Sequence, residues 1–164
     1  MAGLARTRGL ESVFAQQSEY QLRQSVYSHW KPGTAREQAN IALYRYPDLG
    51  IIWTASDQLA LAAVDAVKAL NVAPGRDVMI AGIDWLPEAV AAVSRGELVV
   101  TIGGHFMAGA WSLVQIYDHH RGIRVRTHPV GRWGIVDKNN AGMYLKRLQN
   151  PRWHAVDFRS FTLT

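Results

Sequence analysis

Three short, continuous apolar runs constrain the fold of this chain more than any other feature of its sequence. They span residues 51–53, 78–83 and 98–102, and none of them alternates apolar with polar positions. Strands with one solvent-exposed face alternate apolar and polar residues. Continuous apolar runs are instead typical of strands buried on both faces of a parallel sheet. The sequence therefore predicts an α/β fold, a Rossmann-like parallel sheet sandwiched by helices.

The segments between these runs show helical periodicity. Four apolar stripes predict helices over residues 34–46, 56–71, 87–96 and 106–121. Thr34 and Glu37 have the spacing of a capping box, and Ser56 is suited to cap the second of these helices. Strands and helices therefore alternate through the middle of the chain, as they do in a layered α/β domain.

The two ends of the chain fit this alternation less well. Residues 4–17 are expected to form a helix and residues 21–27 an alternating strand, whereas a looser tail is expected from Ile123 onward. We divide the chain into an α/β lobe over residues 1–122 and a tail or crossover segment over residues 123–164. An α/β layer normally opens on a strand, so either this layer begins with a helix or its first strand is missing.

Composition excludes several classes of protein. With 48% hydrophobic and 19% charged residues, the 164-residue chain can bury a core, and disorder is not expected. We recognise no signal peptide and no apolar stretch long enough to span a membrane. The absence of cysteine excludes thiolate sites and thiol chemistry. The net charge of +5 is modest, and the basic stretch over residues 121–132 has few aromatics, so no nucleic-acid partner is expected.

Polar residues follow each predicted strand at its carboxyl end. In an open parallel sheet, ligands bind at that edge, where loops run into the N-termini of helices. The candidates come from the first helix (Arg6, Arg8), from the loops at residues 54–57 and 84–85, and from residues 103–105. We expect all of them to lie along one edge and to form a small-molecule cleft.

Asp84 is the strongest candidate. A carboxylate at the end of a strand can accept two hydrogen bonds from the hydroxyls of a sugar, and the neighbouring indole of Trp85 could cover the apolar face of the ring. The alternative is that Asp84 caps the helix that starts near Pro87, while Trp85 packs in the core.

The other candidates carry similar alternatives. Ser56 and Asp57 could contact a ligand or only cap the helix that they begin. Gly103 and Gly104 would let the backbone approach a ligand closely, and His105 could donate or accept a hydrogen bond there. Trp30, on the loop before the helix at residues 34–46, is a further candidate at the same edge.

Catalytic and metal-binding patterns are weak in comparison. Asp118, His119 and His120 are consecutive, so on a helix they point in different directions, and the histidines suit a helix C-terminus. No metal and no cofactor is therefore predicted. No phosphate loop, nucleophile elbow or paired carboxylate accompanies Asp84. One enzyme hypothesis stays open, in which His105 is a base oriented by Asp84 within hydrogen-bonding reach.

The middle of the chain resembles a known family. From Arg45 to Trp111, five segments follow one another: RYPDLGIIW, SDQLALAAVDAVKAL, PGRDVMIAGID, EAVAAVSRGEL and TIGGHFMAGAW. Their order is similar to that in the second, C-terminal lobe of the sugar-type periplasmic binding proteins, the ribose-binding and LacI-core superfamily. The GGHF, YDHH and VDF segments resemble those of a subgroup of ABC transporter substrate-binding proteins.

This resemblance implies one lobe of a two-lobed type I periplasmic binding protein, without its first strand and partner lobe. It implies that Asp84 binds sugar hydroxyls and that Arg6 or Arg8 faces the cleft. Ser56 stands where relatives often have an asparagine, and Gly104 stands near the place of a glutamine, so a ligand other than a simple pentose is implied.

The implied function is binding of a sugar or related polar solute for an ABC transporter or a chemosensor in the periplasm, with a membrane permease as partner. The effector-binding core of a LacI-type transcriptional regulator, with the same fold and cleft, is the alternative. A sheet without one of its strands also leaves unpaired edges, so self-association through those edges is expected.

Overall fold

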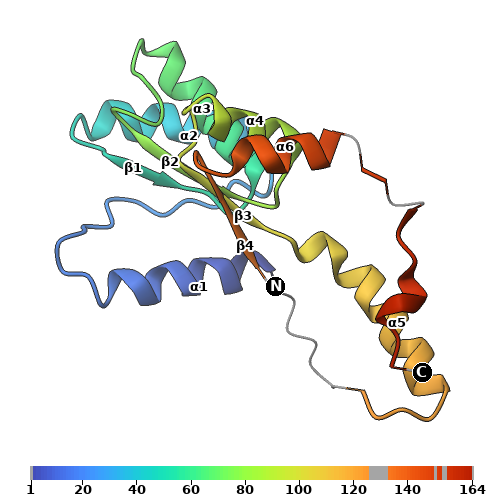
Figure 1. Ribbon diagram of the computed structural model, residues 1–164. Coiled ribbons are helices and arrows are strands. Elements are labelled where there is room, and N and C mark those ends of the chain that lie inside the picture. The colour runs from blue at the N-terminus through green and yellow to red at the C-terminus, as the bar shows by residue number, and fades with distance from the viewer. Residues whose placement is uncertain (1, 126–132, 150, 153–154, 164) are drawn as a thin grey trace.

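The computed structural model describes residues 2–125, 133–149, 151–152 and 155–163. Its centre is a four-stranded sheet in the order β1-β2-β3-β4 (Figure 1). The strands are β1 (Ile51–Trp53), β2 (Met79–Ile83), β3 (Val100–Gly103) and β4 (Gly134–Asp137). The first three run parallel and β4 pairs antiparallel with β3. The predicted α/β class and the three parallel strands are confirmed.

Six α-helices and two short 3-10 turns complete the described elements. They are α1 (Ala2–Phe14), α2 (Pro32–Arg45), α3 (Asp57–Ala69), α4 (Pro87–Ser94), η1 (His105–Met107), α5 (Ala108–His120), α6 (Ala141–Gln149) and η3 (Phe158–Phe161). The helices α3, α4 and α6 lie close to the sheet, whereas α1 lies apart from it and α5 extends away from it (Figure 1).

The hydrophobic core lies where α3, α4 and α6 meet the sheet. Residues from every one of these elements are buried together. The largest fully enclosed apolar side chains come from helices, from strands and from the loop before β3: Val67, Ile80, Val90, Val93, Leu98 and Val136. Small residues let α3 approach β2 closely, because a Cβ on Gly82 would lie 3.0 Å from that of Ala60. The core therefore fixes the ends of the parallel strands that carry the candidate site.

The start of α2 differs from the prediction. The helix begins at Pro32, and its N-cap is Lys31, with no side-chain cap hydrogen bond. Thr34 therefore lies inside the first turn, and the predicted capping box with Glu37 is wrong. The physical reason is that proline has the φ of a first helical residue and lacks the N–H that such a position leaves unpaired.

The strand predicted over residues 21–27 is also wrong. This segment has no regular secondary structure, and its N–H groups make no backbone hydrogen bond to any described residue. Side chains hold it in place instead, because Arg23 donates to Asp48 at 2.6 Å and Arg45 donates to Gln24 at 3.4 Å. Alternation alone does not make a strand when no neighbouring strand is available to pair with it.

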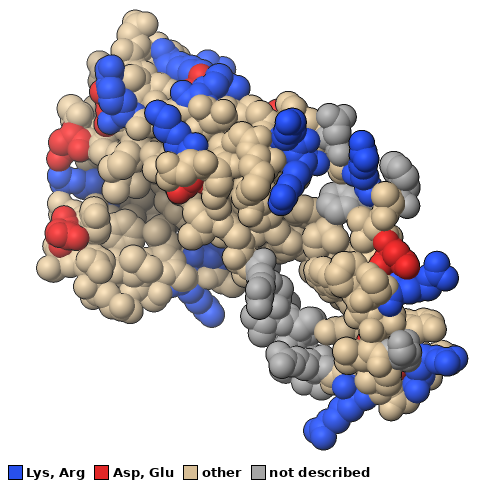
Figure 2. Space-filling view, in the orientation of Figure 1, with Lys and Arg blue, Asp and Glu red and all other residues tan. Residues whose placement is uncertain are grey.

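The segment after Ile123 contributes more to the fold than the predicted loose tail. Strand β4 adds to the edge of β3, and α6 packs against α4, so that Val136 and Ala141 are fully buried. Most of the basic stretch over residues 121–132 lies outside the described residues. On the face shown in Figure 2, the described Lys and Arg residues are scattered rather than gathered into one patch.

Candidate ligand-binding site

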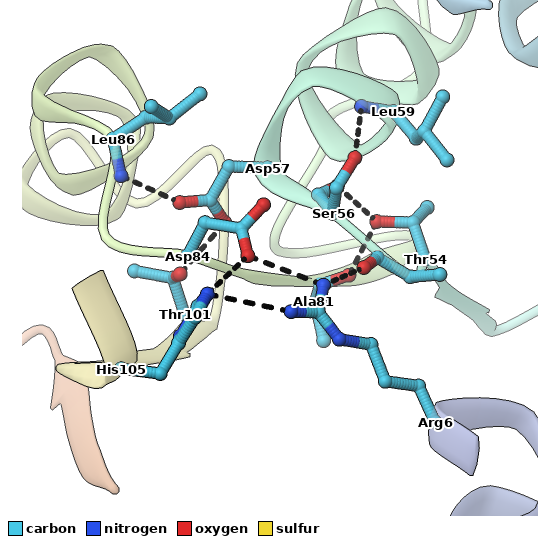
Figure 3. A network of polar contacts seen from close by, with 11 residues as sticks. Arg6, Thr54, Ser56, Asp57, Leu59, Ala81, Asp84, Leu86, Thr101 and His105 are labelled. Atoms are coloured by element: carbon cyan, nitrogen blue, oxygen red, sulfur yellow. Dashed lines mark hydrogen bonds and ion pairs between the residues drawn. The ribbon is translucent and has the colours of Figure 1, made fainter. Parts of the chain in front are cut away.

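The loops that follow β1, β2 and β3 meet at one edge of the sheet, and the first turns of α1 reach the same edge. The residues that approach one another there are Arg6, Thr54, Ser56, Asp57, Asp84, Leu86 and His105 (Figure 3). This arrangement follows from the topology, because parallel strands direct their carboxyl ends to a common side. The convergence predicted for Asp84 and His105 is therefore observed.

The backbone at Asp84 and Trp85 has an unusual conformation. Their φ angles are 133° and 64°, in a region that residues with a side chain rarely occupy. The N–H of Asp84 donates to the carbonyl of Ile102 at 2.8 Å, which keeps the residue attached to β3 as the chain turns. Each such residue costs about 1–3 kcal/mol, so the surrounding contacts must hold the turn in place.

Asp57 supplies one of these contacts from inside the molecule. Its carboxylate is fully buried and accepts hydrogen bonds from Thr101 Oγ1 at 2.6 Å and from the Leu86 N–H at 2.8 Å. Burial raises the pKa of Asp57, and the hydrogen bonds from Thr101 and Leu86 oppose this rise. The ligand contact predicted for Asp57 is corrected, because both of its oxygens link α3 to β3 and to the turn after Asp84.

Arg6, Asp84 and His105 form the polar centre of this edge. Arg6 Nη1 lies 3.1 Å from Asp84 Oδ1 and donates to the carbonyl of Ala55 at 2.5 Å. His105 Nε2 lies 3.3 Å from the same carboxylate oxygen and 3.4 Å from Arg6 Nη2. The side chains of all three remain partly exposed, so a ligand could reach them from solvent.

His105 is held by its own neighbours. Gly104, at a φ of 100°, lets the chain turn from β3 into η1, and the imidazole stacks on Trp133 with ring centres 4.7 Å apart. Its Nδ1 is buried and has no hydrogen-bond partner among the described residues. The accessible chemistry of this histidine is therefore at Nε2, which faces Asp84 and Arg6.

Trp85 packs inside the molecule. Its ring contacts Tyr144 at 4.7 Å between centres, and its Nε1–H donates to the Thr101 carbonyl at 3.3 Å. A Cβ on Gly103 or on Gly134, which are paired across β3 and β4, would lie 2.4 Å from the indole. Gly103 therefore makes room for this indole rather than for a ligand, and Trp85 takes the core-packing alternative.

Of the remaining candidates, Ser56 caps the helix α3, whereas Arg8 and Trp30 lie away from the polar centre. Ser56 is buried and its Oγ accepts from the Leu59 N–H at 3.5 Å, which is the predicted cap of α3. Arg8 is exposed and has no polar partner among the described residues. Trp30 is half exposed and lies against Gly3 of α1. Neither Arg8 nor Trp30 joins the polar centre in this structure.

Trp133 is the functional candidate that the sequence analysis missed. Because β4 runs antiparallel to β3, its amino end lies at the carboxyl edge of the parallel strands, and Trp133 directly precedes β4. The indole is 53% exposed and contacts His105. The signal in the sequence is a tryptophan directly before a short apolar run at residues 134–136, and that run is too short to indicate a strand by itself.

Arg6, Asp84 and His105 bring hydrogen-bond donors and acceptors together within one small area. A carboxylate accepts hydrogen bonds, a guanidinium donates them in a fixed plane, and an imidazole can do either. Hydroxyl groups on adjacent carbons both donate and accept, so they can bridge such a carboxylate and guanidinium. The exposed indole beside them can cover an apolar ring face.

A resident metal or a membrane-spanning helix finds no support in the described part of the chain. No group of three or more His, Asp or Glu residues there is placed to hold a metal ion. Asp118, from the sequence DHH, instead accepts the Leu163 N–H with both oxygens at 3.1 Å. None of the described helices has the length and apolar character needed to cross a membrane.

Comparison with known proteins relates this chain to a family of binding proteins. The chain is 30% identical over 101 residues to the D-allose-binding periplasmic protein of Escherichia coli, covering 62% of this chain and 32% of that protein. It is 27% identical over 130 residues to the D-galactose/methyl-galactoside binding periplasmic protein of Haemophilus influenzae, covering 71% and 38% respectively.

Solved structures give the same result for the fold. A periplasmic sugar-binding protein from Pseudomonas fluorescens matches with a TM-score of 0.84 and 32% identity, over 96% of this chain and 49% of that one. The chain thus spans about half the length of that structure, and less of the two curated relatives. The model of the periplasmic binding protein domain matches residues 2–122. The chain therefore belongs to the periplasmic binding protein domain family.

Proposed function

We propose that this chain is the sugar-binding lobe of a periplasmic solute-binding protein that serves an ABC transporter. The observation that carries the proposal is the convergence of Arg6, Asp84 and His105, which come from α1, the end of β2 and η1. These elements are far apart in the sequence, and only the fold brings their polar ends together. The relatives named above, which bind allose and galactosides, support the ligand class.

Asp84 is the central ligand-binding group in this proposal. Its carboxylate accepts two hydroxyl hydrogen bonds, and Arg6 donates to the oxygen atoms of the same hydroxyls. Arg6 Nη1 and Asp84 Oδ1 lie 3.1 Å apart, and this ion pair orients both side chains. The costly backbone at Asp84 is consistent with a functional position, because strain of this kind is concentrated at binding sites.

Trp133 supplies the aromatic surface that the sequence predicts at Trp85. Its indole is exposed and lies over the imidazole of His105, so one of its faces is available to a sugar ring. Gly104 contributes by its φ of 100°, which sets the direction of His105. The proposed ligand contacts are thus Asp84, Arg6, His105 and Trp133.

The parent protein is proposed to act in the periplasm and to deliver its ligand to a membrane permease. This rests on the periplasmic relatives, which are longer than this chain. Solute-binding proteins of two lobes close around their ligand, so contacts from a second lobe are expected to add affinity. The LacI-type regulator has the same fold, but the named relatives are periplasmic proteins and favour the transport function.

The enzyme hypothesis has less support than binding. His105 Nε2 lies 3.3 Å from Asp84, so the geometric condition for a base and an orienting carboxylate is met. However, Nδ1 is buried and Nε2 already faces Asp84 and Arg6. The nearby hydroxyls of Thr54 and Thr101 donate to Ala81 and Asp57, so neither of them is a free nucleophile.

A side-chain NMR titration tests the proposal. The guanidinium signal of Arg6 and the ring signals of His105 are followed while D-allose, D-galactose, L-arabinose and myo-inositol are added. We expect one of these compounds to shift both signals saturably, even at the weak affinity of a single lobe. No shift with any member of a wider sugar panel would refute sugar binding at this edge.

A matched pair of variants assigns the effect to Asp84. Asp84→Asn removes the negative charge and is expected to weaken binding at least tenfold, which corresponds to about 1.4 kcal/mol. Asp65→Asn removes an equal charge from the exposed side of α3, where no polar partner is present among the described residues, and is expected to leave binding unchanged. Equal weakening in the two variants would contradict the role of Asp84.

A further inference from the structure

The turn that carries Asp84 is attached to the rest of the fold at both of its ends. At its start, the N–H of Asp84 donates to the carbonyl of Ile102 in β3. At its end, the N–H of Leu86 donates to Asp57 Oδ2 at 2.8 Å. The two residues at positive φ, Asp84 and Trp85, lie between these attachments. The Asp57 carboxylate therefore holds the far end of this strained backbone (Figure 3).

The position of the Asp57 carboxylate is fixed from several sides. Asp57 is the first residue of α3 and is fully buried. Thr101 Oγ1, which is also fully buried, donates to Asp57 Oδ1 at 2.6 Å. Gly82 leaves room for this oxygen, because a Cβ at that position of β2 would overlap with it. A carboxylate enclosed in this way moves only if contacts to both β2 and β3 are broken.

Thr101 contacts the same turn a second time. Its hydroxyl donates to Asp57, and its carbonyl accepts the Nε1–H of Trp85 at 3.3 Å. The main chain of the turn and its indole are therefore both held from inside the molecule. The Asp84 carboxylate lies at the partly exposed edge, where its Oδ1 is 3.1 Å from Arg6 Nη1. A network of buried contacts thus sets the place of a side chain at the surface.

Asp57 acts on the turn through hydrogen bonds rather than through its charge. Burial and, more weakly, the negative charge of Asp84 raise the pKa of Asp57. Two carboxylates repel each other, so charge does not hold Asp84 beside Asp57. An amide of the same shape could accept the hydrogen bond from Leu86 equally well. Its nitrogen could donate to the Thr101 hydroxyl, because a hydroxyl both donates and accepts.

We propose that Asp57 is a positioning residue for ligand binding, which does not touch the ligand but orients the Asp84 carboxylate by holding the Leu86 N–H. This inference rests on the proposed function, in which Asp84 accepts hydrogen bonds from the sugar. Without the contact to Leu86, the backbone at Asp84 can relax from its φ of 133°, and the carboxylate no longer stays beside Arg6. The measured affinity then falls with the fraction of molecules that have the correct turn.

Two substitutions of Asp57 separate its shape from its polarity. Asp57→Asn removes the charge but keeps an oxygen that accepts from Leu86. Asp57→Ser keeps a small polar residue in the first turn of α3, but its oxygen stands one bond farther from Leu86. A third variant, Val67→Ala, removes buried apolar atoms from the far end of the same helix and controls for a general loss of stability.

Amide hydrogen exchange tests the positioning without any sugar, so its result does not depend on the proposed function. The readout is the Asp84 N–H, and the reference is the Val99 N–H, which donates to the Ile80 carbonyl at the other end of these strands. Relative to the reference, exchange at Asp84 is expected to accelerate at least about tenfold in Asp57→Ser. In Asp57→Asn and Val67→Ala it should stay within about twofold of the wild type. No acceleration in Asp57→Ser, or equal acceleration in Val67→Ala, would overturn the proposal.

Sugar affinity provides the second readout. For a sugar that shifts the Arg6 signal of the wild type, Asp57→Ser should weaken binding at least about fivefold, whereas Asp57→Asn and Val67→Ala should stay within about twofold. If Asp57→Ser does not fold, Thr101→Val replaces it, since it removes the donor to Oδ1 and should move both readouts in the same direction. Equal affinity in all variants refutes the positioning role and leaves the proposed function standing. If no sugar binds the wild type, the proposed function fails, and the exchange at Asp84 still decides whether Asp57 holds the turn.

Discussion

The helices α3 and α1 have similar lengths but opposite environments. Eight residues of α3 are buried, whereas none of the side chains of α1 from Gly3 to Phe14 is. The helix α3 packs on β2 and against α2 and α4, whereas α1 faces a groove beside an unpaired edge. A helical stripe therefore produces a core only when a sheet is present to receive it.

The same difference separates two halves of the molecule. The packed half consists of α3, α4 and α6 over β2, β3 and β4, and the open half consists of α1, residues 15–30 and the outer edge of β1. The polar centre lies between them, with Asp84 on the packed half and Arg6 on the open half. A substitution in the packed half should therefore lower the free energy of unfolding much more than a similar substitution in the open half.

The largest difference is expected for a charge placed in each half. Val67 is fully buried in α3, so Val67→Asp leaves a carboxylate without a partner and should abolish cooperative unfolding. Leu10→Asp in α1 should cost less than about 1 kcal/mol, because Leu10 borders the open groove. Urea denaturation followed by circular dichroism measures both, and comparable losses would show that the open half is packed in solution.

Two tryptophans near the candidate site provide the next comparison. Trp85→Ala empties the space over Gly103 and Gly134 and should lower the free energy of unfolding by about 3–5 kcal/mol. Trp133→Ala removes a 53% exposed ring and should lower it by less than about 1 kcal/mol. Thermal unfolding distinguishes them, and a larger loss for Trp133 would reverse the assignment of packing and exposed roles.

Asp57 predicts a pH dependence within the packed half. Burial raises the pKa of Asp57 above its ordinary value of 3.8, so its contribution to stability is present at low pH and is lost as pH rises through the folded-state pKa. The free energy of unfolding of the wild type, relative to Asp57→Asn, should therefore fall from about pH 4 upward. A difference that grows with pH would indicate that the hydrogen bonds from Thr101 and Leu86 outweigh burial.

The smallest difference concerns two helix starts. Ser56 caps α3 through the Leu59 N–H, so Ser56→Ala should cost about 1 kcal/mol. Thr34 caps nothing in α2, so Thr34→Ala should change stability by less than about 0.5 kcal/mol. Chemical denaturation resolves this difference, and a cost of about 1 kcal/mol at Thr34 would restore the predicted capping box.

The parallel strands and the helices between them could be predicted because their signals are local. These signals are the continuous apolar runs, the capping Ser56 and the proline at the start of α4. Each of them determines the structure of residues close to it in the sequence. Strand β4 and the segment at residues 21–27 depend instead on partners distant in the sequence. The residues of β4 form only a short apolar run, which does not distinguish a strand from a loop. The run becomes a strand because it pairs with β3.

The candidate site divides in the same way. The convergence of Asp84 and His105 could be predicted because strand ends in a parallel sheet share an edge. The inward position of Trp85 could not be predicted, because it requires Gly103 and Gly134 to be neighbours across two strands. The buried role of Asp57 likewise depends on Thr101, which is 44 residues away.

A crystal structure of the chain grown with a saturating sugar identified by the titration tests the central claim most directly. We expect ring hydroxyls within hydrogen-bonding distance of both the Asp84 carboxylate and the Arg6 guanidinium, with the sugar ring against Trp133. A sugar bound elsewhere, with the ion pair of Arg6 and Asp84 untouched, would contradict the assignment of the binding site to this edge of the sheet.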